Sequence, residues 1–376
     1  MSDAALRSPL HAEHVALGAT LVPFAGWEMP VRYTGDIAEH TAVRTAAGLF
    51  DLSHMGEISV RGDGAAAFLD HALVGRMSAV GLWGAKYTMM CTPEGGVIDD
   101  LIVYRRDWDH FIIVANAANK DVVMAELGAR LGGFDATLED VSSEIALIAV
   151  QGPRAEEIVA RMCVRGDDDI HAMRYYTAAN ILLTGDIHAF AARTGYTGED
   201  GFELFVAADQ AAAVWELALA EGAGDGLVPC GLSARDSLRL EAGMPLYGQE
   251  LTRDTTPFDA GLGRIVAFGT AANPRGDFVG RDALLRAKAA GPARVLVGLM
   301  GDGRRAARTG YAVTDDAGTQ VGTVTSGAPS PTLGRPIAMA YVPQALSAPG
   351  TVVGIDVRGR REDMTVVTLP FYSRAS

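Results

Sequence analysis

The sequence predicts an α+β protein with antiparallel sheets, followed by a C-terminal β-barrel. Three strand-like segments, residues 86–91, 97–105 and 109–117, are joined by short turns and should form an antiparallel meander. Helical segments alternate with these and other strands in the first part of the chain. From about residue 291 the chain holds short strands with turns between them, which is typical of a separate barrel or sandwich.

Length and charge narrow the possible functions. The chain has 376 residues, which predicts two or three domains of roughly 150 residues each. Its formal net charge is −14, whereas nucleic acids and anionic membranes are bound by basic surfaces. We therefore expect a small molecule or a protein as the partner, with no nucleic acid and no membrane.

Cysteines and hydrophobic runs indicate the compartment. Cys91, Cys163 and Cys230 show no CxxC spacing, so neither a disulfide framework nor a thiolate metal site is expected. The N-terminus lacks the basic start and apolar core of a secretory signal, and no run approaches about 18 apolar residues. These features predict a cytoplasmic protein.

The beginning of the chain combines an ordered turn with two helices. Aromatic, glycine and proline residues crowd into 24–30, which marks the turn. Helices are expected at 37–47 and 62–74, on either side of a segment that leads into a strand at 57–60. His54 lies in that segment without a second ligand at a useful spacing, so no metal site is predicted.

A glycine turn and strand at residues 93–104 carry the most unusual pattern. Asp99 and Asp100 are adjacent in this strand, so they project to opposite faces, and both faces are otherwise apolar. Such a strand is covered on both sides, so at least one carboxylate should point into a poorly solvated region. Burial of a carboxylate is costly unless it is paired, hydrogen-bonded or protonated. Either this segment is the working centre, or one Asp is solvated and the other caps backbone.

The expected turn geometry selects one of the two carboxylates. If the turn at 106–108 centres near Asp107 and Trp108, Asp99 stands opposite Asn116 on the same face of the sheet. A register slip of one residue would break this pairing. The pair is either functional or a structural pair in which each group satisfies the other.

The same order of elements recurs later in the chain. A helix is expected at 120–131, an apolar strand at 145–150 and a helix at 154–162, followed by strands at 181–183 and 190–193. The recurrence is one of element order and not of residue identity.

A second unusual stretch covers residues 193–206. Its glycines allow backbone conformations closed to other residues and would let a ligand approach the main chain. Tyr196 supplies a ring for stacking or hydrogen bonding, and Glu203 places a carboxylate in an apolar strand. The alternative is a glycine-rich hairpin with an exposed Glu. It is not a phosphate loop, because no Gly-Lys-Ser/Thr follows.

Residues 229–241 begin a helix in which Ser233 and Asp236 have the spacing of a capping box. Arg235 would then lie in the first turn, where a cation opposes the helix dipole, so an anionic or acceptor partner is expected there. Arg239 could pair with Glu203 or Asp236, and an internal salt bridge is the structural alternative.

In the last part of the chain, short strand-like segments separated by turns predominate. A helix at 282–289 precedes short strands at 294–300, 311–314, 322–325, 338–342, 351–357 and 365–369. Residues 326–334 are expected to form a rigid loop within this barrel.

Motifs spread in order over nearly the whole chain resemble the aminomethyltransferase family, the T-protein of the glycine cleavage system. They are Phe-Ala-Gly-Trp at 24–27, Asp-Leu-Ser-His-Met at 51–55, Gly-Gly-Val-Ile-Asp-Asp at 95–100, Gln-Gly-Pro at 151–153, Thr-Gly-Tyr-Thr-Gly-Glu at 194–199, and the segments 234–243 and 326–334.

The resemblance implies a fold and a reaction. The fold has a folate-binding core at 1–280 and a β-barrel at 281–376. The core contains two intertwined α+β subdomains, approximately 1–50 with 140–240 and 51–139 with 241–280. The reaction moves the methylene of aminomethyl-lipoyl H-protein to tetrahydrofolate, giving 5,10-methylenetetrahydrofolate, ammonia and dihydrolipoyl H-protein. No metal and no flavin are implied.

The resemblance also implies site residues. The essential carboxylate is the first Asp of the Gly-Gly-Val-Ile-Asp-Asp motif, Asp99. It would orient the folate nucleophile and stabilise the iminium-like charge of the transferred carbon. Folate-contacting positions fall on Asn116, Glu203 and Arg235, with pocket walls at Tyr196, Tyr87 and Met55 and a C-terminal arginine at Arg374.

Two other classes of function compete with this interpretation. A folate-coupled demethylase or flavin oxidase fragment could use the same fold, but the chain leaves no room for a flavin domain and carries no dinucleotide fingerprint. A non-catalytic folate-binding paralogue is the other, but such proteins carry a cysteine beside the Tyr-x-Gly-Gln-Glu element, where Met244-Pro245-Leu246 stand here.

Overall fold

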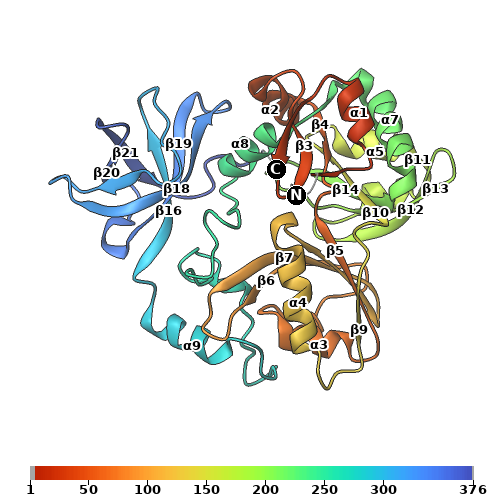
Figure 1. Cartoon of the computed structure of the whole chain (residues 1–376), viewed down its shortest axis with the longest axis horizontal. Coiled ribbons are helices and arrows are strands. Elements are labelled where there is room, and N and C mark those ends of the chain that lie inside the picture. Colours follow the sequence, from red (N-terminus) through yellow and green to blue (C-terminus); the bar gives the residue numbers. More distant parts are fainter. Residues whose placement is uncertain (1–4, 375–376) are drawn as a thin grey trace. The chain divides into compact units, whose positions relative to one another are not determined.

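The computed structural model describes residues 5–374 and has the predicted α+β class, with antiparallel sheets and a closed C-terminal barrel (Figure 1). The chain divides into two compact units, each described here by itself. Unit 1 comprises the described residues up to Leu69 together with Met77–Tyr87 and Leu101–Asp236. Unit 2 comprises Asp70–Arg76, Thr88–Asp100 and the described residues from Ser237 onward. The interleaved subdomain boundaries expected for residues 1–280 stay a prediction.

A seven-stranded sheet with the order β11-β12-β13-β14-β10-β4-β15 forms the main layer of unit 1. All its strand pairs are antiparallel except β15 with β4. Its strands are β4 (Ala47–Asp51), β10 (Ile145–Gln151), β11 (Cys163–Arg165), β12 (Ala178–Leu183), β13 (Ile187–Ala192), β14 (Gly201–Ala207) and β15 (Leu227–Pro229).

Helices bury their apolar residues against this sheet. They are α5 (Ala155–Met162), α6 (Asp167–Ala172) and α7 (Ala211–Gly222), with the 3-10 turns η2 (Ala208–Gln210) and η3 (Ala223–Asp225). Trp215 of α7 and Phe202 of β14 belong to one buried hydrophobic cluster. Burial of large side chains stabilises the layer by roughly 1.5–3 kcal/mol each. The apolar strand expected at 145–150 and the helix expected at 154–162 are confirmed as β10 and α5.

A small three-stranded sheet, with the order β1-β3-β2, stands at the start of the chain. Its elements are β1 (Leu6–Arg7), α1 (His11–Ala16), β2 (Thr20–Phe24), β3 (Trp27–Arg32) and α2 (Asp36–Thr45). The turn expected at 24–30 is confirmed, because Ala25 and Gly26 reverse the chain between β2 and β3 with positive φ.

A five-stranded sheet has the order β6-β7-β8-β5-β9, which confirms the expected meander. Its strands are β5 (Gly56–Arg61), β6 (Ala85–Cys91), β7 (Val97–Asp107), β8 (His110–Ala115) and β9 (Thr137–Asp140), with α3 (Ala65–Ala72), η1 (Ala117–Asn119) and α4 (Lys120–Arg130) between them.

The register of β7 and β8 differs from the expected one by one residue. Val103 pairs with Ile113, whereas a pairing of Asp99 with Asn116 requires Val103 to face Ile112. The turn lies one position later than expected, and a bulge between Arg105 and Asp107 inserts an extra residue into β7. The expected partnership of Asp99 and Asn116 is therefore wrong as a register argument.

Unit 2 contains the barrel, whose strands close in the order β16-β19-β18-β17-β20-β21. They are β16 (Arg294–Gly301), β17 (Ala312–Thr314), β18 (Gln320–Ser330), β19 (Arg335–Pro343), β20 (Val352–Asp356) and β21 (Arg361–Val367), with η4 (Gly263–Ile265), α9 (Arg281–Ala290) and η5 (Gln344–Leu346) outside them. Valine, alanine and isoleucine side chains fill its centre. The barrel is confirmed, but residues 326–334 are mostly strand: β18 and β19 pair as far as Ser330 and Arg335 and form a hairpin.

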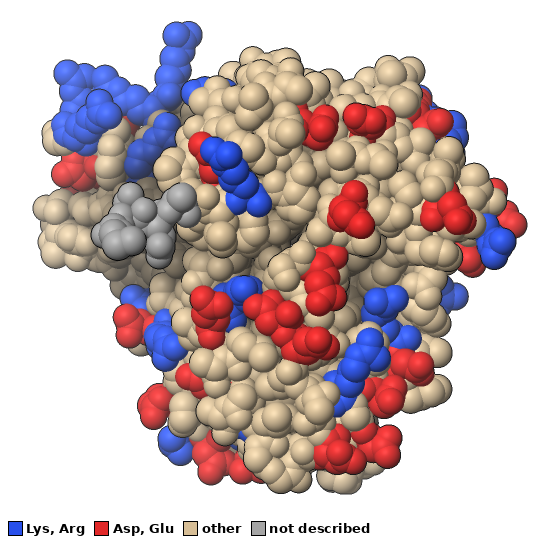
Figure 2. Space-filling model, turned by 45° about the vertical axis from the view of Figure 1, so that its right-hand side comes forward, with Lys and Arg blue, Asp and Glu red and all other residues tan. Residues whose placement is uncertain are grey.

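The surface reflects the negative net charge. Figure 2 shows acidic side chains spread over the visible face, with one group of Lys and Arg side chains at its upper left and others interspersed among the acidic ones. No helix in residues 5–374 is long and apolar enough to cross a membrane.

Candidate functional site

Glu203 is the best-defined polar group of the predicted site. It lies in the middle of β14 and is buried together with Thr194 and Tyr104. The Tyr104 hydroxyl donates a hydrogen bond to Glu203 Oε2 over 3.0 Å, and Thr194 Oγ1 donates to the same oxygen over 2.6 Å. Within residues 5–374, no hydrogen bond reaches Oε1 of Glu203. One carboxylate oxygen is thus held by the protein, and the other has unused acceptor capacity.

Tyr104 reaches Glu203 from a different sheet. It stands on β7, and its ring packs edge-on against Phe205 and Phe190, with ring centroids 5.3 Å and 5.8 Å away. Burial raises the pKa of the Tyr104 phenol well above its usual range, and the charge of Glu203 raises it further. The phenol therefore keeps its proton and acts as a donor.

Two glycines of the 194–201 stretch pack against a buried glutamine. An added Cβ at Gly195 would lie 2.0 Å from Gln151 Oε1, and one at Gly201 would lie 2.2 Å from Gln151 Nε2. Gln151 in turn donates from Nε2 to the Thr194 carbonyl over 3.0 Å and accepts from Thr197 Oγ1 over 2.9 Å. These two glycines make room for Gln151, which holds the segment after β13 that contains Thr194.

Arg235 lies beside Tyr196. The guanidinium carbon is 5.0 Å from the centre of the Tyr196 ring, and both residues are half-buried. No ion pair or hydrogen bond holds the Arg235 guanidinium within the described residues. Burial lowers its pKa, while Glu203 and Tyr196 act in the opposite direction. Arg235 is thus a desolvated cation with free donors near a carboxylate.

The helix that carries Arg235 starts earlier than expected. Helix α8 spans Leu232–Glu241, so Ser233 lies inside it and the predicted capping box is wrong. The Arg235 N–H donates to the Gly231 carbonyl over 3.2 Å, and the Gly231 N–H donates to Glu39 Oε2 over 2.9 Å. A Cβ at Gly231 would lie 2.4 Å from the backbone of Val31. Close packing of backbone against backbone therefore sets the start of α8 and keeps Arg235 in its first turns.

His54 is buried and interacts electrostatically with Arg235. Burial lowers the pKa of His54 to about 4, and Arg235 contributes in the same direction. Its Nδ1 atom is buried without a hydrogen-bond partner. Among residues 5–374, no group of three or more His, Cys, Asp or Glu side chains could hold a metal ion.

Three other predicted residues stand on separate elements of unit 1. Tyr87 is on β6, Met55 follows β4, and Asn116 precedes η1; all three side chains are half-buried. The contacts described above join Tyr196, Glu203 and Arg235, and they do not include these three.

The remaining predicted residues belong to unit 2. Asp99 is fully buried, Asp100 is half-buried, and Arg374 is exposed. A glycine turn precedes the aspartates as expected: the Gly95 N–H donates to the Thr92 carbonyl over 2.9 Å. Gly96 packs so closely that a Cβ would lie 1.9 Å from the Arg253 carbonyl oxygen.

Side-chain alternation along β7 separates the two aspartates. Asp100, Ile102 and Tyr104 project from one face of the strand, and Asp99 projects from the other. The Tyr104 face is the one that reaches Glu203. Asp99 and Asp100 therefore project to opposite faces of β7, as the sequence predicts.

Arg239 has a buried acidic partner that the sequence did not suggest. It forms a buried salt bridge with Glu250, with 3.0 Å between Nη1 and Oε2, and donates to Ser326 Oγ over 2.8 Å. The structural alternative, an internal salt bridge, therefore describes Arg239.

Tyr104 and Thr194 are site residues that the sequence reasoning missed. The available signal was a tyrosine in the apolar strand β7 and a threonine in the segment that follows β13. Their meeting depends on contacts across 90 positions of sequence, which no local pattern reports.

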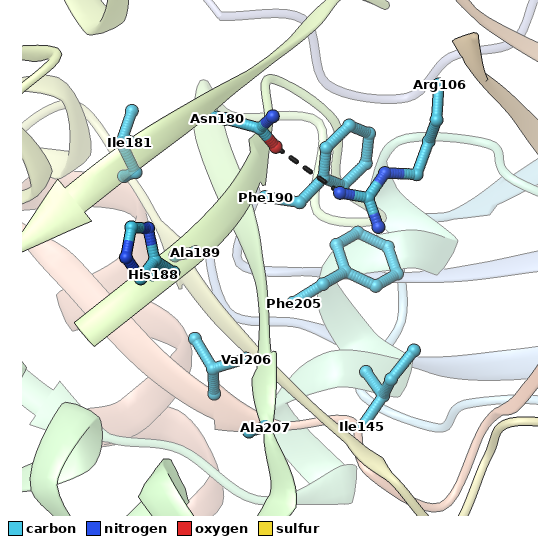
Figure 3. Close-up of a pocket in the computed structure, with 10 residues that line it drawn as sticks. All are labelled: Arg106, Ile145, Asn180, Ile181, His188, Ala189, Phe190, Phe205, Val206 and Ala207. Atoms are coloured by element: carbon cyan, nitrogen blue, oxygen red, sulfur yellow. Dashed lines mark hydrogen bonds between the residues drawn. The ribbon is translucent and has the colours of Figure 1, made fainter.

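A surface cavity of about 380 Å³ lies elsewhere in unit 1, and none of the predicted site residues lines it (Figure 3). Arg106 extends over it, donates to Asn180 Oδ1 over 3.4 Å, and places its guanidinium carbon 4.7 Å from the centre of the Phe190 ring. Phe190 and Phe205 form part of its wall, and both also pack against Tyr104. The cavity therefore borders the back of the Glu203 network and is distinct from the predicted folate site.

Comparisons with known proteins agree along the whole chain. The family models that match are the GCVT N-terminal domain over residues 10–270 and the glycine cleavage T-protein C-terminal barrel domain over residues 294–373. The aminomethyltransferase of Streptomyces avermitilis is 55% identical over 377 residues, covering 99% of each chain. That of Geobacillus kaustophilus is 45% identical, covering 98% of this chain and 99% of the relative.

A solved structure shows the same fold. The crystal structure of the glycine cleavage system aminomethyltransferase T from Bartonella henselae matches with a TM-score of 0.89 and 36% identity, covering 98% of each chain. The two family models together span the α+β part and the barrel. They and the relatives named above all indicate the same family. The chain belongs to the aminomethyltransferase family, the T-proteins of the glycine cleavage system.

Proposed function

We propose that this protein transfers the methylene group of aminomethyl-lipoyl H-protein to tetrahydrofolate, giving 5,10-methylenetetrahydrofolate, ammonia and dihydrolipoyl H-protein. The observation that carries the proposal is the full-length match to aminomethyltransferases, with 55% identity over 99% of the chain. A demethylase or a non-catalytic paralogue is not favoured, because relatives that cover 98–99% of the chain are named as aminomethyltransferases.

The bonds that change define what the protein must supply. Two C–N bonds form between the transferred carbon and N5 and N10 of tetrahydrofolate. The bond from that carbon to the amino nitrogen and the bond to the lipoyl sulfur break. The two folate N–H protons pass to the leaving amine and thiolate. The site must therefore orient the folate nitrogens and move protons between neutral and charged groups.

Glu203 and Arg235 suit the recognition of a pterin ring. Pterins present a row of N–H donors next to a carbonyl acceptor. Glu203 can accept from the donor edge with its unused oxygen, and Arg235 can donate to the acceptors. Tyr196, which already stacks on Arg235, would form an adjoining wall.

We place the catalytic carboxylate in β7. The family resemblance assigns the role to Asp99, the first aspartate of the Gly-Gly-Val-Ile-Asp-Asp motif, and the adjacent Asp100 projects from the other face of the strand. A carboxylate there would orient the folate nucleophile and stabilise the positive charge that develops on the transferred carbon. Comparison of Asp99→Asn with Asp100→Asn decides between them.

The remaining assignments complete the proposal. Tetrahydrofolate acts as acceptor substrate, and no metal or flavin is invoked. Lipoylated H-protein is the protein partner, and we place the enzyme in the cytoplasm. Asn116, Tyr87, Met55 and Arg374 are proposed as additional folate contacts on the strength of the family resemblance.

Ammonia release from aminomethylated H-protein tests the proposal. We expect release to be slow without tetrahydrofolate and to accelerate strongly when tetrahydrofolate is added. The same rate with and without the folate would refute the proposed reaction. Free lipoylated H-protein, which carries no aminomethyl group, is the control and should release no ammonia.

A further inference from the structure

We propose that Tyr104 and Thr194 are positioning residues that hold one oxygen of the Glu203 carboxylate and turn the other toward the donor edge of the pterin. This inference rests on the proposed function, because it assigns Glu203 to pterin recognition. It adds that selectivity for the donor edge of the pterin depends on Tyr104 and Thr194, two residues that do not have to contact the folate.

The three groups form a closed contact triangle. Both hydroxyls lie within hydrogen-bond distance of Glu203 Oε2, at 3.0 Å from Tyr104 and 2.6 Å from Thr194, and they lie 3.1 Å from each other. Each hydroxyl has one proton, so both protons can be donated to an ionised carboxylate at the same time. Hydrogen bonds to a charged acceptor are the strong ones, so this arrangement fixes the carboxylate orientation.

The two hydroxyls are themselves held in place. Tyr104 is fully buried, and its ring lies edge-on between Phe205 and Phe190. Thr194 is buried, and its carbonyl accepts a hydrogen bond from Gln151 Nε2 over 3.0 Å. Neither donor can follow Glu203 to a new position without disturbing packed neighbours. The carboxylate is therefore held before any ligand arrives.

The nearby Arg235 explains why a fixed orientation of the Glu203 carboxylate is useful. Glu203 and Arg235 influence each other electrostatically, yet they form no salt bridge in this structure. If the Glu203 carboxylate rotated freely, it could form a salt bridge with the Arg235 guanidinium. The Glu203 acceptors and the Arg235 donors would then not be available to bind the ligand. With Oε2 held by two hydroxyls, Oε1 and the Arg235 donors both stay available.

Selectivity between two folates provides the test. Dissociation constants are measured for tetrahydrofolate and for its 2-desamino-2-methyl analogue, which lacks the pterin 2-amino donor. In Tyr104→Phe and Thr194→Val, we expect about tenfold weaker binding of tetrahydrofolate, the equivalent of one lost hydrogen bond. We expect little change in the dissociation constant of the analogue, so the variants should lose most of the wild-type preference for a folate with the 2-amino group. If the variants bind both ligands more weakly by the same factor, or bind neither more weakly, the inference is overturned.

Matched variants separate positioning from loss of structure. Tyr33→Phe removes a comparable buried hydroxyl contact, 2.9 Å from His14 Nδ1, and should leave the preference unchanged. Thr194→Ser retains the hydroxyl and should restore it. If Tyr104→Phe does not fold, the comparison of Thr194→Val with Thr194→Ser carries the test, since an unrestored preference in the Ser variant contradicts the inference.

A double-variant cycle distinguishes failure of this inference from failure of the proposed function. In the Glu203→Gln background, Tyr104→Phe should have no further effect on the preference. If Glu203→Gln weakens tetrahydrofolate binding but Tyr104→Phe and Thr194→Val do not, positioning is refuted and pterin recognition by Glu203 stands. If Glu203→Gln has no effect either, the assignment of Glu203 fails, and the inference fails with it.

Discussion

Replacement of Glu57 by Gln should make the protein more stable at neutral pH. Glu57 lies on β5 and is fully buried, and both its carboxylate oxygens lack a hydrogen-bond partner. Burial raises the pKa of Glu57 well above its usual range, and the nearby Asp140 raises it further. Lys120 opposes this shift, but its ammonium group pairs with Asp140 over 2.8 Å. The carboxyl group is therefore protonated in the folded state.

The size of the effect follows from proton linkage. An unfolded Glu ionises near pH 4.3, so above that pH folding must take up a proton, at a cost of about 1.36 kcal/mol per pH unit. Below the pKa of Glu57 in the unfolded chain, burial of the neutral carboxyl group carries no proton-uptake cost. As the pH rises from that pKa toward the higher pKa of the folded protein, the free energy of unfolding decreases. Between pH 4.3 and 7 the loss reaches at most about 3.7 kcal/mol. Gln has nearly the same shape and does not titrate.

Urea unfolding of the wild type and Glu57→Gln between pH 4 and pH 8 measures this difference. We expect the two proteins to have similar stability near pH 4 and the variant to be more stable by about 1–3 kcal/mol at pH 7. Glu144→Gln, at an exposed glutamate, is the control and should follow the wild-type curve. Equal stability of wild type and Glu57→Gln at every pH, or a less stable variant at pH 8, would refute the reasoning.

Three more predictions concern the site and unit 2. Asp99→Asn should fold and bind tetrahydrofolate but lose most turnover, while Asp100→Asn keeps more of it; single-turnover rates check this, and the opposite order would assign the role to Asp100. Glu203→Ala should weaken folate binding by about 10- to 100-fold with the fold intact, and an unchanged fluorescence titration would count against it. Glu250→Ala should destabilise the protein by about 3–5 kcal/mol, because it leaves the buried Arg239 charge without its partner; urea unfolding measures the loss, and a change below 1 kcal/mol would be inconsistent with a buried pair.

Features set by local pattern could be predicted from the sequence. The meander, the apolar strand β10 and the C-terminal barrel follow from hydrophobic periodicity and turn residues. A carboxylate inside the apolar strand β14 identified Glu203 as unusual before its partners were known. A positively charged residue in the first turns of α8 drew attention to Arg235 before its contact with Tyr196 was known.

Features set by small shifts or distant contacts could not be predicted. A turn one position later than expected, only partly offset by the bulge after Arg105, shifted the β7 register by one residue and removed the pairing argument for Asp99. The start of α8 is set by close packing of Gly231 on Val31, which no capping pattern reports. The partners of Glu203 come from strands that only the folded chain brings together.

Product analysis with labelled substrate tests the central claim most directly. H-protein carrying an aminomethyl group with carbon-13 in the methylene is mixed with tetrahydrofolate and the enzyme. We predict that the label appears in 5,10-methylenetetrahydrofolate, with one ammonia and one free lipoyl thiol formed per labelled product. Label that stays on H-protein or leaves as free formaldehyde, while tetrahydrofolate is unchanged, would contradict the assignment of this protein as an aminomethyltransferase.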